Sequence, residues 1–400
     1  MTRSRARVGP QSTKAAPRLD VDGLLDDTSV GIIVCCGSGG VGKTTTSAAL
    51  GLRAAERGRR VVVLTIDPAR RLAQSMGIAE LDITPRPVAG IDATAGGSLD
   101  AMMLDMKRTF DEVVESQASP EKAQQILDNT FYQALSSSFA GTQEYMAMEK
   151  LGQIHRDARV GEPDGTYDLI VVDTPPSRSA LDFLDAPERL SSFLDGRFIR
   201  LLLTPARGPA RLMTAGFSII TGALTKVLGA TFLRDVQTFV GAIDTLFGGF
   251  RVRAQQTFRL LQADGTAFIV VAAPEPDALR EAAYFVERLS GDGMPLAGLV
   301  VNRAATAPSS RLSAEEAAAA AGRLAKDPGS LAAGLLRLYA DRSRLVEREA
   351  GLRARFAAAH PEVPTAVVPA LAGDVHDLVD LRRVGVLLGG QDDDTRVATG

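Results

Sequence analysis

The stretch GSGGVGKT, which runs from Gly37 to Thr44, has the GxxxxGK[ST] pattern of a loop that binds phosphate groups. An apolar, β-branched run precedes it at residues 32–34, and a run typical of a helix follows it at residues 45–55. A strand, a glycine loop and a helix in this order surround a polyphosphate with backbone N–H groups and the positive end of a helix. In such a unit Lys43 reaches the β- and γ-phosphates, and the hydroxyl of Thr44 ligates Mg²⁺.

The composition is that of an ordinary globular protein. The chain has 400 residues, of which 45% are hydrophobic and 23% are charged, and its net charge is −3. This balance does not favour nucleic acid or a membrane surface as a partner. The sequence has no apolar signal segment, and its longest uncharged apolar stretch, Leu212–Thr225, is shorter than the roughly 20 residues that cross a bilayer. We therefore expect a cytoplasmic protein with no nucleic-acid partner.

The cysteines of this chain are adjacent to each other, as Cys35 and Cys36. They lie on the predicted strand before the glycine loop, where neighbouring side chains point to opposite faces of the sheet. We expect both to serve in core packing. A disulfide framework is excluded, and so is a zinc or iron–sulfur site built on the cysteines of one chain.

Short apolar runs that end in polar residues recur along the chain, with helical segments between most of them. Several lack strict alternation, as expected for strands that are buried on both faces of a parallel sheet. The pattern predicts an α/β fold, namely a doubly wound, mostly parallel sheet of the P-loop NTPase type. Ligands of such sheets bind at the carboxyl ends of the strands. The predicted strands are 31–36, 60–67, 101–105, 167–173, 266–272, 297–302 and 365–369.

Two intervals between predicted strands are too long for simple crossovers and have helical periodicity. We expect residues 106–165 and 185–263 to form one helical subdomain, inserted in a P-loop domain that spans residues 29–388. The basic N-terminal arm (1–28) and the acidic tail (389–400) are expected to be disordered. Ser313 and Glu316 have the spacing of a capping box and predict the start of another helix.

Two aspartates follow predicted buried strands and are candidates for nucleotide chemistry. Asp173 comes after the apolar run Leu169–Val172, where a P-loop NTPase places a carboxylate that holds Mg²⁺ directly or through water. Asp67 precedes a proline and fits the group that orients or activates the attacking water. An aspartate can instead end a strand or cap the next helix. The P-loop upstream favours the functional interpretation for both. For Arg70 and Arg71, a phosphate contact and a surface ion pair stay open.

Several motifs together carry a resemblance to a known family. They are Gly39–Thr45, Asp67-Pro68-Ala69, Asp173–Pro176 with Leu181 and Phe183-Leu184, Val300–Asn302 and, more weakly, Gly141–Glu144. The sequence resembles the deviant-Walker-A ATPases, specifically the family of the arsenite-pump ATPases and the tail-anchored-protein-targeting ATPases. Within that family it is most similar to the paired ArsA-like ATPases of actinobacteria. The resemblance covers roughly residues 30–385, including the positions of both helical intervals.

The resemblance implies a dimeric ATP hydrolase that uses ATP and Mg²⁺. It implies that Asp67 is a switch I residue that activates or positions water, with Lys43 as the second catalytic residue. Asp173 would begin switch II and, with Thr44, serve the metal. Asn302 resembles the residue that contacts adenine, and Pro369 resembles a proline near the base. The nucleotide-binding residues implied in the loop are Gly39, Gly40, Val41, Gly42, Lys43, Thr44 and Thr45.

Two departures from the family pattern affect the expected assembly. Family members usually carry a second, signature lysine that reaches the phosphates of a partner subunit, and Ser38 stands at that position here. Cations supplied in trans can contribute on the order of 10³–10⁵ in rate, and a serine hydroxyl cannot replace the charge. The chain also lacks the Cys-x-x-Cys pair that holds the zinc-stapled homodimer. We therefore expect a homodimer or heterodimer, with a related ATPase subunit that supplies the signature lysine.

The helical subdomain suggests a surface for a hydrophobic client or a membrane-protein partner, because flexible methionines and bulky aromatic residues suit varied apolar partners. Ordinary packing within the subdomain is the competing interpretation. The candidate residues are Met146, Met148, Phe217, Ile220, Phe232, Phe239 and Phe247.

Three other functions stay open at this stage. One is a nucleotide-gated binding module with little hydrolysis, and another is a small-molecule kinase. A partitioning ATPase of the MinD/ParA type is less favoured, because it predicts a basic amphipathic C-terminal helix, whereas this chain ends in an acidic tail.

Overall fold

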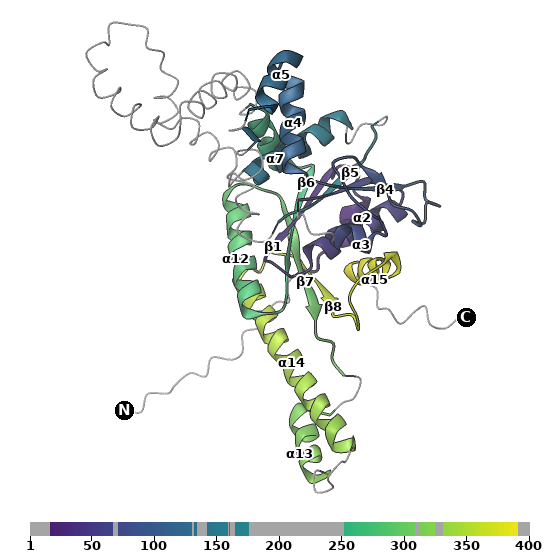
Figure 1. Ribbon diagram of the computed structural model, residues 1–400. Coiled ribbons are helices and arrows are strands. Elements are labelled where there is room, and N and C mark those ends of the chain that lie inside the picture. The colour runs from purple at the N-terminus through teal and green to yellow at the C-terminus, as the bar shows by residue number, and fades with distance from the viewer. Residues whose placement is uncertain are drawn as a thin grey trace, which may run out of the picture.

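The fold is organised around one eight-stranded sheet in the order β3-β4-β2-β5-β1-β6-β7-β8 (Figure 1). The computed structural model describes residues 17–390 apart from 67–70, 130–131, 134–141, 159, 161–164, 176–251, 309–311 and 325–330. Neighbouring strands pair in parallel except β3 and β4, which are antiparallel. The strands are β1 (Ile32–Gly37), β2 (Arg60–Thr65), β3 (Arg86–Pro87), β4 (Ser98–Met103), β5 (Leu169–Asp173), β6 (Thr266–Ala272), β7 (Leu296–Ala304) and β8 (Thr365–Pro369).

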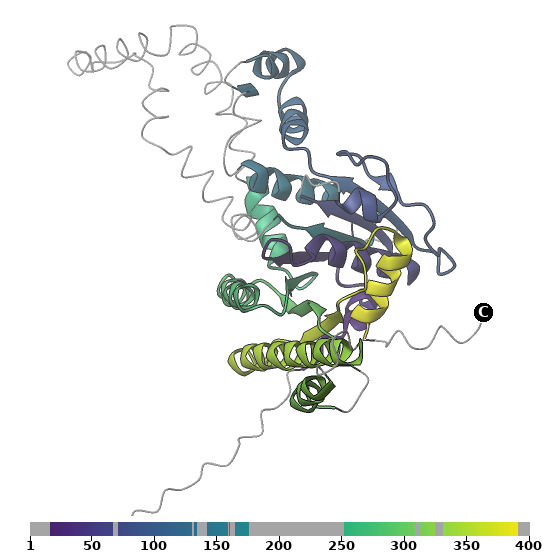
Figure 2. The ribbon, with the colours of Figure 1, turned by 60° about the horizontal axis from the view of Figure 1, so that its bottom comes forward.

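Helices cover both faces of this sheet, which confirms the predicted doubly wound α/β class (Figures 1 and 2). The central strands β1, β5 and β6 are buried along their whole length, and this explains their nearly continuous apolar sequences. The described helices are α1 (Val21–Asp26), α2 (Lys43–Glu56), α3 (Arg71–Ser75), α4 (Met106–Gln117), α5 (Pro120–Leu127), α7 (Thr142–Asp157), α12 (Pro276–Gly291), α13 (Ala314–Leu324), α14 (Leu331–Ala359) and α15 (Leu378–Leu388).

The two cysteines mark the two faces of the sheet. Cys35 lies in the core beneath α2 and α15, and Cys36 lies in the core beneath α7 and α12, as their adjacent positions on β1 predict. Both are fully enclosed free thiols. Burial raises the pKa of Cys35 to about 12 and raises that of Cys36 further, because a thiolate loses its hydration there. The role expected for them in core packing is thus confirmed.

Strand boundaries follow the sequence prediction closely for β6 and β8 and less closely at the edge of the sheet formed by β3 and β4. The strands predicted at 266–272 and 365–369 are found with those bounds. The strand predicted at 101–105 begins instead at Ser98, and the prediction missed the edge strand β3, which contains a proline. Proline is tolerated on an edge strand because its missing N–H leaves no pairing partner unsatisfied there.

The segment before β1 differs from the disordered arm expected for residues 1–28. Leu19, Val21 and Leu25 are buried against the face that α2 covers. Asp20 caps α1 by accepting a hydrogen bond from the backbone of Gly23. Val21 and Leu25 are four residues apart on one face of α1, and their burial together with that of Leu19 orders this segment.

The first helical interval contains α4, α5 and α7, together with the short helical segment at Tyr132. Phe110 and Tyr132 pack edge to face, with ring centroids 5.4 Å apart. Met146 and Met148 on α7 are buried, so these two residues belong to the core and not to an exposed client surface. Of the second interval only residues 252–263 are described, and the other candidate client residues lie outside the described part. A single inserted helical subdomain stays a prediction.

The C-terminal half adds a helical hairpin, α13 and α14, that extends beyond the sheet in Figure 1. The capping box that predicted its start is present. The hydroxyl of Ser313 accepts from the backbone N–H of Glu316 at 3.1 Å, and the Glu316 carboxylate accepts from the backbone N–H of Ser313 at 2.8 Å. None of the helices in the described ranges combines the length and the apolar character needed to cross a membrane.

Candidate nucleotide site

The glycine loop lies at the carboxyl edge of the sheet, between β1 and the first turn of α2. Gly42 is the N-cap of α2 and has a φ of +96°, a left-handed conformation that glycine adopts without strain. A Cβ on Gly42 would lie 2.2 Å from Nδ2 of Asn302. Glycine is therefore required here for two reasons, the backbone conformation and the close approach of β7.

Lys43 is buried and held by the loop that precedes it. Its Nζ donates to the carbonyl oxygens of Gly37 at 3.0 Å and Ser38 at 2.9 Å. Wrapping the side chain back over the loop places its charge beside the backbone N–H groups at the start of α2, where a phosphate group would bind. Phosphate binding by Lys43, which the motif predicts, stays a prediction.

Thr44 and Asp173 are brought together, although 129 positions separate them in the chain. The Thr44 hydroxyl donates to Oδ2 of Asp173 at 2.8 Å, and the hydroxyl of Thr65 donates to the same oxygen at 2.9 Å. Asp173 is fully buried at the end of β5, between β1, which leads into the glycine loop and Thr44, and β2, which ends at Thr65. Thr65 was not predicted from the sequence. The sequence signal that could have found it is a hydroxyl residue near the carboxyl end of the predicted strand 60–67.

Asn302 and Arg303, at the end of β7, form a two-point contact with the glycine loop. Nδ2 of Asn302 donates to the carbonyl of Val41 at 2.9 Å, and the guanidinium of Arg303 donates to the carbonyl of Gly40. The Asn302 side-chain oxygen accepts from the backbone N–H of Arg303 at 2.9 Å. An amide in this position keeps one N–H and one lone pair for a ligand. Arg303 was not predicted from the sequence.

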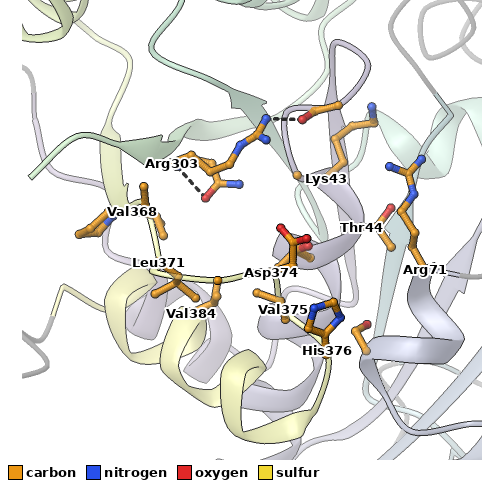
Figure 3. Close-up of a pocket in the computed structure, with 18 of the residues that line it drawn as sticks. Lys43, Thr44, Arg71, Arg303, Val368, Leu371, Asp374, Val375, His376 and Val384 are labelled. Atoms are coloured by element: carbon orange, nitrogen blue, oxygen red, sulfur yellow. Dashed lines mark hydrogen bonds between the residues drawn. The ribbon is translucent and has the colours of Figure 1, made fainter. Parts of the chain in front are cut away.

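A cavity of about 560 Å³ opens beside these residues. Figure 3 shows that the loop after β8 forms its opposite wall, with Leu371, Asp374 and His376 directed toward it. The size is within the range of pockets that hold nucleotide-sized ligands. Of the predicted site residues, those that line the cavity are Gly40, Gly42, Lys43, Thr44, Thr45, Asn302 and Pro369.

The charged and apolar residues that line this cavity suit an anion joined to an apolar group. Among the described lining residues, the cations Lys43, Arg71 and Arg303 outweigh the carboxylate of Asp374. The wall farther from the loop contains apolar side chains, including Val368 and Leu371. Arg303, at the cationic end, and Val368, at the apolar end, lie on neighbouring strands. Ala304 of β7 pairs with Pro369 of β8, which places the ends of these strands side by side. The cavity thereby joins a cationic end beside the glycine loop to an apolar end.

The other predicted loop residues are not among the described residues that line the cavity. Gly39 and Val41 belong to the same loop, and Val41 is buried beneath it. Asp67 and Arg70 lie outside the described residues. Within the described ranges, no group of three or more histidine, cysteine or acidic side chains is arranged to hold a metal ion. The candidate metal ligands are thus the single carboxylate of Asp173 and the hydroxyl of Thr44.

Residues 30–319 match the family model of the ArsA ATPases, which are described as anion-transporting ATPases. The chain belongs to the ArsA ATPase family. The resemblance inferred from the motifs is confirmed, and with it membership of a family of ATPases. The glycine loop, Asp173 and Asn302 all lie within the matched range.

Individual relatives of the ArsA ATPase chain are distant. It is 26% identical to the putative arsenical pump-driving ATPase 1 of Aquifex aeolicus over 46% of this chain and 45% of that protein. It is 24% identical to ATPase get3 of Schizosaccharomyces pombe over 71% and 76%. It is 27% identical to the ATPase ASNA1 homolog of Trypanosoma cruzi over 68% and 74%. The chain thus spans less than half of the first relative and about three quarters of the other two.

Proposed function

We propose that this chain is a Mg²⁺-dependent switch ATPase of the ArsA type, which binds ATP at the β1–α2 loop and hydrolyses it in a dimer. The single observation that carries the proposal is the cluster of Thr44, Thr65 and Asp173 beside the cavity. Family membership supports ATP as the nucleotide.

The donor groups fit a magnesium ion. Thr44 uses its only hydroxyl hydrogen on Asp173, which leaves the lone pairs of its oxygen for a cation. Hard oxygen donors of this kind suit Mg²⁺, which keeps several waters and shares phosphate oxygens with the nucleotide. We assign Thr44 as a direct ligand and Asp173 as a ligand directly or through water. When bound, the ion would neutralise charge on the phosphates. Thr65 is a positioning residue, because its hydroxyl holds the carboxylate of Asp173.

The apolar end of the cavity is the proposed adenine site. Asn302 has one N–H and one lone pair remaining for the base edge, and Pro369 with Val368 offers an apolar surface for the ring. Lys43 would exchange its two carbonyl partners for the β- and γ-phosphates. Backbone N–H groups from Gly39 to Thr45 would supply the other phosphate contacts.

Hydrolysis needs a group that orients the attacking water, and we assign this role to Asp67. Its position after β2 supports the assignment, since β2 pairs with β5 and Thr65 of β2 already touches Asp173. Movement of Asp67 and of the segment after Asp173 with nucleotide state would couple hydrolysis to the helical subdomain. A hydrophobic client or a membrane-protein partner would bind there.

The assembly we propose contains a related ATPase subunit. Ser38 has no charge to offer a second subunit, and its carbonyl oxygen is already used by Lys43. A subunit with a lysine at that position would supply the missing cation in trans, with an effect on the order of 10³–10⁵ in rate. The second candidate function is a nucleotide-gated binding module with little hydrolysis. Ser38 favours this second function, because it lacks the charge that speeds hydrolysis.

Replacing Asp67 by Asn tests the catalytic assignment in the full chain. We expect the Asp67→Asn protein to bind ATP as tightly as the wild type while its ATPase rate falls by at least about 100-fold, the range for loss of a positioned proton acceptor. Turnover that survives the change would overturn the role of Asp67. Asp173→Asn should instead weaken the Mg²⁺ dependence of ATP binding.

The assembly is tested by purification of the native complex, with the ATPase rate measured with and without the co-purified subunit. A low rate for the isolated chain that rises with the partner supports the hetero-assembly. Full activity of a homodimer of this chain would contradict it. A chain that binds ATP yet stays inactive in the complex would favour the binding module.

A further inference from the structure

Arg303 is held in an unusual backbone conformation at the edge of the cavity. Its φ is +57°, and it is the single described residue other than glycine with a positive φ. The left-handed region is unfavourable for an arginine, because its Cβ crowds the following carbonyl. Such conformations persist where surrounding contacts determine them, and they cluster at functional sites. Here the contact is the hydrogen bond from the backbone N–H to the side-chain oxygen of Asn302.

The conformation directs the guanidinium onto the phosphate-binding loop. It donates to the carbonyl of Gly40, three residues before Lys43, although 263 positions separate the partners in sequence. In Figure 3 the side chains of Arg303 and Lys43 extend toward the same end of the cavity. Both cations therefore bond to carbonyl oxygens of one loop, Lys43 to Gly37 and Ser38 and Arg303 to Gly40.

A neutral carbonyl is a weak partner for a guanidinium compared with a phosphate. Charge-assisted bonds between arginine and phosphate are shorter and about twice as strong as neutral hydrogen bonds. The Arg303 side chain is exposed, so turning it into the cavity requires no unpacking of the core. A polyphosphate on the loop would thus draw the guanidinium from Gly40, as it draws the amine of Lys43 from its two carbonyls.

We propose that Arg303 is a phosphate-binding cation that this chain contributes to its own nucleotide. The inference rests on the proposed nucleotide site and adds a residue and a specificity to it. Arg303 favours nucleotides with more phosphates, whereas Asn302 beside it serves the base. Two adjacent residues at the end of β7 would therefore contact both the phosphates and the base of the nucleotide.

The test is isothermal titration calorimetry of the full chain with MgATP, MgADP and AMP. The variant is Arg303→Asn, because asparagine tolerates the left-handed conformation and removes the charge. We expect ATP binding to weaken about 10- to 100-fold, the range for loss of a hydrogen bond to a charged group, and AMP binding to change less than about threefold. Arg303→Lys keeps the charge and should recover most of the ATP affinity.

The matched control is Arg344→Gln, which removes an exposed arginine that pairs with Asp341 on α14, outside the cavity. It should leave all three affinities unchanged. Equal losses for ATP, ADP and AMP in Arg303→Asn would show that Arg303 only supports the loop, and would overturn the proposal. Unchanged ATP binding would overturn it as well. A wild-type protein that binds none of the three nucleotides would refute the proposed function itself, and this inference with it.

Discussion

At the scale of single residues, the missing Cβ of Gly42 allows Asn302 to approach the glycine loop closely. Two independent costs oppose an alanine there, the φ of +96° and a Cβ only 2.2 Å from Nδ2 of Asn302. We expect Gly42→Ala to lower the free energy of unfolding by about 2–3 kcal/mol and to weaken nucleotide binding, because Asn302 must move away from the loop. Urea denaturation and calorimetric titration with MgATP measure the two effects.

Gly77 provides a matched control for the backbone cost alone. Its φ is +67°, and a Cβ on it would meet nothing within 4 Å. Gly77→Ala should therefore cost about 1 kcal/mol, which is the strain of the left-handed conformation without a clash, and should not alter nucleotide binding. If both variants lost the same free energy of unfolding, the close approach of Asn302 to Gly42 would add nothing to the cost of the alanine.

At the scale of elements, Arg59 connects segments that are distant in sequence. Its buried guanidinium donates to four backbone carbonyls, those of Leu25, Asp27, Val30 and Asp168. These carbonyls lie at the end of α1, before β1 and before β5, and Arg59, which directly precedes β2, bonds to all of them. Burial lowers the pKa of Arg59, since the cation loses hydration that the carbonyls replace in part.

Replacing Arg59 by Met should cost about 3 kcal/mol of unfolding free energy, because buried carbonyls lose their partners while the volume stays similar. Arg86→Met is the control, since Arg86 pairs with Asp82 on an exposed edge and should contribute less than about 1 kcal/mol. Thermal and urea unfolding compare the two. A change no larger for Arg59→Met than for Arg86→Met would contradict the linking role.

At the scale of the whole molecule, ion pairs between elements predict how stability depends on pH. The Arg53 guanidinium holds the pKa of Asp22 below its usual value, and the Arg60 guanidinium does the same for Asp168. These pairs join α1 to α2 and β2 to the start of β5. Because the folded pKa is depressed, the stabilisation is present above the unfolded value of 3.8 and is lost as pH falls through the folded pKa.

We therefore expect the free energy of unfolding to be steady from neutral pH to about pH 5 and to fall below about pH 4. Urea denaturation at a series of pH values measures the curve. The Asp22→Asn and Asp168→Asn double variant should be less stable at pH 7 and should show a shallower fall at acid pH. An unchanged slope would mean that other groups control acid unfolding.

Local patterns were sufficient for the class of the fold and for one half of the site. The glycine loop, Lys43 and Thr44 could be predicted because adjacent residues form a strand, a loop and a helix whose geometry is local. Asp173 could be placed because a buried strand ends at it. The edge strand β3 and the ordered segment before β1 were not predicted, since both depend on contacts with distant residues.

By itself, then, the sequence determined a P-loop α/β protein of the ArsA ATPase family, together with its lysine, its threonine and its buried aspartate. Only the tertiary structure decided what lies opposite the loop. Thr65 on Asp173, Arg303 on Gly40 and the wall that follows β8 come from segments far apart in the chain. No local pattern specifies such contacts. They follow from the order of strands in the sheet, which places the ends of β2, β5, β1, β7 and β8 along one edge.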